Sequence, residues 1–194
     1  MKKLIIIFII LSTVGILSAA DTYYGTSDTT GSGINYGTLV GYQRALMITS
    51  TEEITADSIY ILIRKYGLGS SYIMVAIMRS ADSSRVDVSD SVEITDANEK
   101  IWIAIPMNGE TLKADSSYFL GAAGDAEVDA FRLTSGGSKT TLYRSGAWDG
   151  AWDDPETGWT TTTSAELWIY VAGTASGGEE ETSGRRRRLL GGNR

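Results

Sequence analysis

The chain has 194 residues, with 17 Lys and Arg against 24 Asp and Glu, and it contains neither His nor Cys. The lack of Cys excludes disulfide scaffolds, thiol nucleophiles, iron–sulfur clusters, structural zinc fingers and a cysteine-linked lipid anchor. The lack of His excludes Ser-His-Asp catalysis, histidine general bases and zinc sites that need imidazole. This length is enough for one domain with its own core and too short for two ordinary domains.

Residues 1–20 have the composition of a secretory signal peptide. A basic start at Lys2 and Lys3 precedes an apolar run, and small residues follow that run up to Ala20. The run is too short for a membrane-spanning helix, which needs about 20 apolar residues. We therefore expect a secreted, extracellular or cell-surface protein, cleaved after Ala20 or one residue earlier.

Residues 174–194 form a segment of different composition. Gly and Ser separate a block of three glutamates from the four arginines that run from Arg185 to Arg188. The segment has too few apolar residues for their burial to offset the conformational entropy of ordering the chain. We therefore expect a flexible tail. The arginines have three interpretations: solvation of the C-terminus (which we favour), contact with an anionic surface, or a site for a processing protease.

The charge of the central part of the chain is strongly negative. Between Asp21 and Gly178 there are 10 basic and 21 acidic residues, a net charge of about −11. This balance argues against nucleic-acid binding by the folded domain, because such domains present basic surfaces to phosphates. It fits an extracellular protein kept in solution by self-repulsion.

Residues 21–173 are expected to form one all-β domain. Apolar residues alternate on both faces in 59–63 and 72–78, which predicts central, buried strands, and the Gly and Ser residues between them predict a hairpin. Pro106 ends a third alternating stretch because it cannot donate to a ladder. The strong expected strands cover residues 59–63, 72–78, 101–105, 118–123 and 167–172, and weaker ones cover 44–49, 91–95, 130–133 and 140–143.

About nine short strands without intervening helices predict an antiparallel two-sheet β-sandwich. We expect a jelly-roll-like topology first, because strand number and loop lengths suit it, and an immunoglobulin-like sandwich as the alternative. Trp102 and Trp168 lie inside alternating stretches and are expected in the core. One internal echo pairs residues 54–60 with 112–118: an aliphatic residue precedes Ala-Asp-Ser, and a Tyr opens a strand. We interpret Ala-Asp-Ser as a turn capped by Asp.

The segments that contain this echo, together with 75–78 and 101–105, resemble secreted bacterial β-sandwich modules with a jelly-roll-like fold. Such modules occur in extracellular and cell-surface proteins, often beside glycan-acting domains. The resemblance covers residues 44–123, rests on hydrophobic patterning and short turns, implies an accessory or adhesive role, and transfers no catalytic residue.

The segment 148–159 contains three of the five tryptophans and four carboxylates. Sugar-binding sites use flat aromatic faces for the C–H surface of the ring and polar groups for its hydroxyls. The candidate ligand-binding residues are Trp148, Asp149, Trp152, Trp159 and the preceding Tyr143. The alternative is that the tryptophans plug one end of the sandwich while the acids face water.

Closely spaced carboxylates also suit Ca²⁺, which prefers several oxygen ligands in flexible geometry. The candidate metal ligands are Asp149, Asp153, Asp154 and Glu156. Their spacing does not match an EF-hand loop, so this hypothesis rests on composition.

Tyr23 and Tyr24 belong to a second aromatic segment, which continues to Tyr36 and Tyr42 among glycines. It is either an adaptable recognition surface or, as we favour, an N-terminal arm laid across the sheet.

Catalysis would need a carboxylate pair at a defined separation, as in glycoside hydrolysis. The acids of the loop 148–159 could supply such a pair, but composition does not define their separation and no second acidic motif stands opposite them. The sequence contains no phosphate-binding glycine loop with its lysine. We therefore expect a non-enzymatic module that binds glycan or a cell-surface polymer through the Trp/Asp-rich loop. The alternative is a structural subunit of an extracellular layer, fibre or virion.

Overall fold

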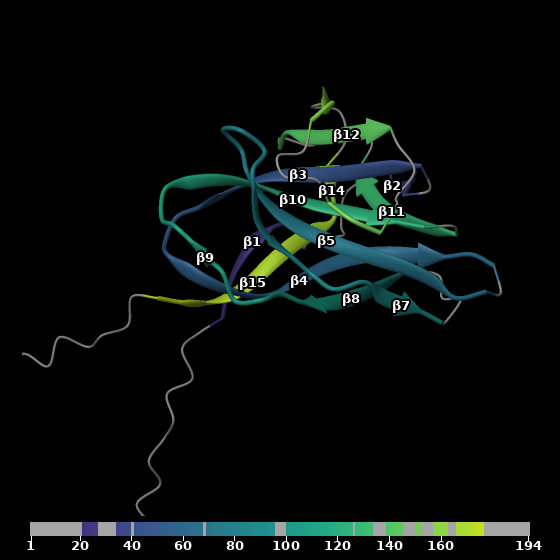
Figure 1. Cartoon of the computed structure of the whole chain (residues 1–194), viewed down its shortest axis with the longest axis horizontal. Coiled ribbons are helices and arrows are strands. Elements are labelled where there is room, and N and C mark those ends of the chain that lie inside the picture. Colours follow the sequence, from purple (N-terminus) through teal and green to yellow (C-terminus); the bar gives the residue numbers. More distant parts are fainter. Residues whose placement is uncertain are drawn as a thin grey trace, which may run out of the picture.

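The computed structural model describes residues 21–26, 34–39, 41–67, 69–95, 100–125, 127–133, 139–145, 150–152, 157–162 and 166–176. These residues form a two-sheet antiparallel β-sandwich, and the described ranges contain no helix (Figure 1). The expected fold class is confirmed. The targeting segment and the charged part of the tail lie outside the described residues. No helix in the described part of the chain is long and apolar enough to cross a membrane.

Sheet A is built around the long strand β4, which lies between β15 on one side and β8 on the other. Strand β1 pairs with the far edge of β15, and β11 pairs with the end of β4. The strands of sheet A are β1 (Asp21–Gly25), β2 (Ile34–Thr38), β4 (Ile54–Lys65), β8 (Ile101–Pro106), β9 (Thr111–Leu112), β11 (Val128–Leu133), β14 (Glu166–Leu167) and β15 (Ile169–Ala175).

Sheet B has β10 at its centre, between β3 and β5. The strand order is β13-β12-β3-β10-β5-β6, and β7 also pairs with β5. The strands of sheet B are β3 (Tyr42–Ser50), β5 (Ser71–Arg79), β6 (Arg85–Val88), β7 (Val92–Ile94), β10 (Ser116–Gly124), β12 (Thr141–Ser145) and β13 (Thr160–Thr162). Figure 1 shows β3, β10 and β5 in a layer above β4 and β8.

The long strands alternate between the two sheets along the chain. β3 lies in sheet B, β4 in sheet A, β5 in sheet B, β8 in sheet A and β10 in sheet B. This repeated crossing is jelly-roll-like and differs from a sandwich built of hairpins. The hairpin expected between residues 59–63 and 72–78 is therefore wrong: β4 and β5 belong to opposite sheets, and each pairs with other strands on both of its edges.

The main core lies between the sheets and follows from the period-two alternation. Ile59, Ile61 and Ile63 of β4 and Ile73 and Ile77 of β5 are completely buried in it. Each such isoleucine contributes about 1.5–3 kcal/mol through removal of its side chain from water. The prediction that both strands are central and buried is confirmed.

The two copies of the internal echo differ in structure. Ile54 and Leu112 are both buried, and they lie opposite each other where β4 pairs with β9. The second copy forms the expected turn, with Asp115 at a φ of 54°. The first copy does not turn: its Asp57 stays within β4, at an irregularity in the pairing with β15.

The two ends of the folded domain lie at one edge of sheet A. Asp21 at the start of β1 pairs with Thr174 near the end of β15. β15 continues to Ala175, past the expected domain end at residue 173, and the N–H of Ser176 donates to the carbonyl of Glu53.

Candidate functional site

The Trp/Asp-rich segment is described in part. Trp148, Asp149, Asp153, Asp154 and Glu156 lie outside the described residues, so their proposed roles stay predictions. The described ranges contain no group of three or more His, Cys, Asp or Glu residues that could hold a metal ion. Tyr143 lies in β12, half-buried, opposite Arg44 of β3.

Trp152 packs against the outer face of sheet B and is only 4% exposed. Its ring lies over a row of small residues, because Ala45, Gly121 and Ala76 are in register on adjacent strands. A Cβ atom at Gly121 would be 2.7 Å from Cη2 of Trp152. The ring therefore occupies the space that glycine leaves, which is a common reason for glycine in a strand interior.

Trp159 continues this cover over sheet B. Its ring stacks on Trp152, with centroids 6.4 Å apart and planes at 22°. Beneath them lie apolar residues of β5 and β10, including Met78 and Phe119. The described tryptophans of the loop thus cover the outer face of sheet B, whereas the alternative expectation placed one or two of them as plugs at an end of the sandwich.

The outer face of sheet A carries a cluster of four aromatic side chains, which we call the aromatic face: Tyr23, Tyr60, Trp102 and Tyr170. They come from β1, β4, β8 and β15, which are neighbours in the sheet. Tyr60, Trp102 and Tyr170 each lie at an outward position between inward-facing apolar residues, and Tyr23 precedes Tyr24, which packs against the core. The alternation that fills the core therefore also places these rings on the surface.

Tyr170 is the centre of the aromatic face. Its ring is parallel to that of Tyr60, with centroids 4.8 Å apart. Tyr23 meets it edge-on at 5.6 Å, and Trp102 is tilted against it at 5.3 Å. Tyr23 is 56% exposed, and the other three rings are half-buried.

The environment of Tyr170 favours its neutral form. Burial raises the pKa of the Tyr170 phenol, and the neighbouring phenols of Tyr60 and Tyr23 raise it further. The hydroxyl group therefore stays protonated, and able to donate a hydrogen bond, to a more alkaline pH than an ordinary phenol.

A buried aromatic cluster adjoins the aromatic face. Leu62, Phe131 and Trp168 pack together there, with Trp102 against them. The Lys100 ammonium lies 5.3 Å from the centroid of the Trp168 ring. Trp168 is buried as expected, but in this outer cluster and not between the sheets, and Trp102 is half-buried on the surface.

Sequence reasoning did not group these four residues. The sequence pattern places Tyr23 in the N-terminal arm, Trp102 in the core, and Tyr60 and Tyr170 within alternating stretches. The arm forms a true strand, β1, in which Tyr24 packs against the core and Tyr23 faces outward. The available signal was an aromatic residue at an outward position in each of several strands, but the register that joins them comes from the structure.

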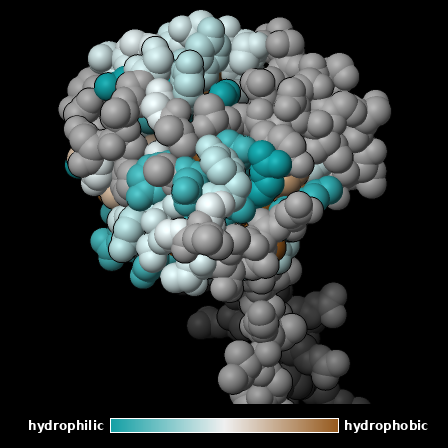
Figure 2. All heavy atoms as spheres, turned by 90° about the vertical axis from the view of Figure 1, so that its right-hand side faces the viewer, coloured by the Kyte–Doolittle hydropathy of each residue, from teal (hydrophilic) through white to brown (hydrophobic). Residues whose placement is uncertain are grey.

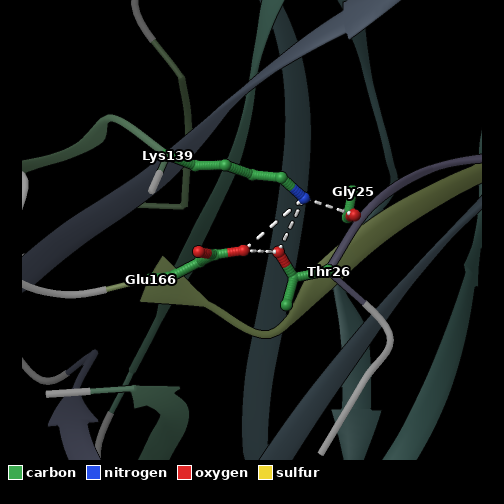
Figure 3. Close-up of polar contacts among 4 residues, drawn as sticks. All are labelled: Gly25, Thr26, Lys139 and Glu166. Atoms are coloured by element: carbon green, nitrogen blue, oxygen red, sulfur yellow. Dashed lines mark hydrogen bonds and ion pairs between the residues drawn. The ribbon is translucent and has the colours of Figure 1, made fainter. Parts of the chain in front are cut away.

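A polar cluster lies at the end of β1 (Figure 3). The Lys139 ammonium donates to the carbonyl of Gly25 at 2.5 Å and to Oγ1 of Thr26 at 3.0 Å, and it lies 3.5 Å from Oε1 of Glu166. The Thr26 hydroxyl in turn donates to Glu166. A hydroxyl between a lysine and a carboxylate resembles an activated nucleophile, but Thr26 is buried, and we interpret the cluster as a clamp for β1.

The end of the sandwich at the right of Figure 1 differs from the aromatic face in the hydropathy of its surface. Figure 2 shows this end, where the coloured residues are mostly hydrophilic or neutral. Few strongly hydrophobic residues reach the surface in this view.

Comparison of the sequence with protein-family models and with curated proteins gives no match.

Proposed function

We propose that this protein is a secreted, non-catalytic β-sandwich module that binds glycan or another cell-surface polymer through the aromatic face. The observation that carries the proposal is the cluster of four aromatic rings on adjacent strands, with Tyr23 more than half exposed. Aromatic rings present apolar area for the C–H faces of sugars, and phenol and indole groups supply hydrogen bonds for the hydroxyls.

The strands hold these rings in place before a ligand arrives. Tyr60 and Tyr170 lie on the paired strands β4 and β15, and each shields one face of the other. Tyr23 and Trp102 flank Tyr170 from β1 and β8. Rings fixed by packing lose little conformational entropy on binding, so a modest contact area can still give useful affinity.

The Trp/Asp-rich loop remains part of the proposal in a smaller role. Trp152 is occupied in covering sheet B, so any contact from this loop would come from Trp148, Asp149 and the residues near them. The same carboxylates remain a proposed Ca²⁺ site. Trp152 and Trp159 of the loop pack against sheet B, whereas the aromatic face belongs to sheet A.

Co-sedimentation of the secreted protein with insoluble polysaccharides tests the proposal. We expect Tyr23→Ala and Trp102→Ala each to weaken binding about tenfold, as loss of a central aromatic contact does. Tyr72→Ala is the matched control, because Tyr72 is a comparably exposed tyrosine of sheet B. If Tyr23→Ala and Trp102→Ala bind as tightly as Tyr72→Ala and the native protein, the aromatic face is excluded as the contact surface.

The structural-subunit alternative predicts a different behaviour of the same variants. A subunit that assembles through the aromatic face forms oligomers at micromolar concentration, and Tyr23→Ala shifts it toward the monomer. A binding module stays monomeric in both forms. Sedimentation velocity separates the two outcomes, and a variant that ends after Ser176 tests whether the tail drives assembly, because this cut leaves β15 whole.

A further inference from the structure

A second site, distinct from the aromatic face, lies at one end of the sandwich. A cavity of about 320 Å³ opens between the turn that joins β5 to β6 and the turn that joins β9 to β10. This end cavity is at the lower limit of the roughly 300–1,000 Å³ that small-molecule sites span. Its size suits a single sugar-sized molecule better than a polymer chain.

The lining of the end cavity is basic, unlike the rest of the domain. Arg79 and Lys113 line it, and no Asp or Glu is among its described lining residues. The domain as a whole carries about −11, so two cations without a lining carboxylate depart from its average composition. Two cations that line one small cavity favour an anionic ligand over a neutral one.

Hydroxyl groups and an apolar wall complete the lining. Ser116 and Ser117 begin β10, and Thr111 belongs to β9. The ring of Tyr118 is buried against the core, and its hydroxyl accepts a hydrogen bond from the backbone N–H of Lys113 at 2.8 Å. Sugar hydroxyls and the C–H face of a sugar ring find partners in such a wall.

The two cationic side chains differ in whether they have hydrogen-bond partners within the protein. Nη1 of Arg79 donates to the Ser84 hydroxyl at 3.0 Å, and Asp82 lies in the same turn, where hydrogen bonds from Ser84 and the charge of Arg79 lower the pKa of its carboxyl. Arg79 is therefore held in place but partly neutralised. The Nζ of Lys113 has no hydrogen-bond or ion-pair partner within the described part of the chain, which leaves its charge available to a ligand.

We propose that the end cavity binds an acidic, monosaccharide-sized ligand whose anionic group, a carboxylate or a sulfate, contacts Lys113 and Arg79. The Ser116 hydroxyl, which donates to the carbonyl of Ala114, then accepts from the ligand's polar edge, and Val86 with the edge of Tyr118 lies against its apolar face. This site does not depend on the aromatic face, because its residues come from other strands and its ligand is recognised by charge.

Titration of the full secreted chain with glucuronate, glucose 6-sulfate and neutral glucose, followed through backbone amide shifts, tests the proposal. We expect saturable shifts at Ser116 and Ser117 with an anionic sugar, about tenfold weaker binding of glucose, and weakening by NaCl. Comparison of glucuronate with glucose 6-sulfate identifies the preferred anion. Glucose binding as tightly as both anionic sugars, or shifts scattered over the surface, would overturn the proposal.

Two variants locate the site without disturbing the core. Lys113→Met removes the unengaged charge, and Ala81→Trp fills the cavity from an exposed turn position; we expect each to weaken binding of the anionic sugar about tenfold or more. Arg144→Gln changes the net charge equally but lies on β12, separated from β5 by β3 and β10, and should bind like the native protein. Unchanged affinity in both cavity variants would refute the site. Tyr23→Ala should leave this binding intact, so failure here is distinguishable from failure of the aromatic face.

Discussion

The rings of Tyr60 and Tyr170 lie parallel on the outer face of sheet A, with their centroids 4.8 Å apart and their planes at 5°. The two residues are directly opposite each other where β4 pairs with β15. Cross-strand aromatic pairs of this kind stabilise a sheet by about 0.5–1.5 kcal/mol beyond the area they bury. The pair therefore joins the two central strands of the sheet and supports the flanking rings of Tyr23 and Trp102.

A double-mutant cycle measures this pair. Tyr60→Ala and Tyr170→Ala should each destabilise the protein, and the double variant should lose about 0.5–1.5 kcal/mol less than the sum of the two. Urea unfolding gives the free energies. Strict additivity would mean that the stacked rings do not interact.

The pKa of Tyr170 leads to a stability prediction at alkaline pH. Burial, with the neighbouring phenols, raises this pKa above its ordinary value of 10.0. The folded protein then retains a proton that the unfolded chain has lost, so the free energy of unfolding should fall as pH rises through and above 10. Urea unfolding between pH 8 and about 11 measures the slope. Tyr170→Phe should show a smaller slope, and an equal slope would contradict the assignment.

Gly121→Ala tests the cover over sheet B. The added Cβ would be 2.7 Å from the Trp152 ring, which must move, and overpacking of this kind costs about 1–3 kcal/mol. Tryptophan emission should shift to longer wavelength as Trp152 becomes exposed. Gly69→Ala is the control, because a Cβ there meets nothing within 4 Å. Equal stability of the two variants would show that Trp152 does not rest on Gly121.

The polar clamp predicts coupling between Lys139 and Glu166. Lys139→Met removes the donor to Gly25 and Thr26 and leaves the nearly buried Glu166 carboxylate with less compensation, at a cost of about 1–3 kcal/mol. Addition of Glu166→Gln should then cost less than the same change in the native background. Thermal unfolding of the four proteins provides the comparison. If the two substitutions change the unfolding free energy additively, Lys139 and Glu166 do not interact energetically.

The sequence identifies most of the strands because a buried strand leaves a strong period-two signal. Residues 101–105 and 118–123, for example, correspond closely to β8 and β10. Strand pairing is harder to predict: residues 67–71 have the composition of a hairpin turn, yet the strands on either side, β4 and β5, belong to opposite sheets. Strand partners are chosen by packing across the whole domain, and a local turn pattern does not report that choice.

The site was harder to predict for the same reason. The Trp/Asp-rich loop stands out in composition because its residues are consecutive, although the Trp152 ring is buried against Gly121. The aromatic face is assembled from four separate strands, so no single window contains it. Only the register, with Tyr60 opposite Tyr170 and Tyr23 on the next strand, brings these rings together.

Indole N–H resonances of the full chain, recorded during titration with a soluble polysaccharide it binds, test the central claim most directly. The five tryptophans give separate probes: Trp102 belongs to the aromatic face of sheet A, whereas Trp152 is buried against the outer face of sheet B. We predict that the Trp102 resonance shifts saturably and that the Trp152 resonance stays in place. A Trp102 resonance that does not move while those of Trp148, Trp152 or Trp159 shift would contradict the account and place the ligand at the loop.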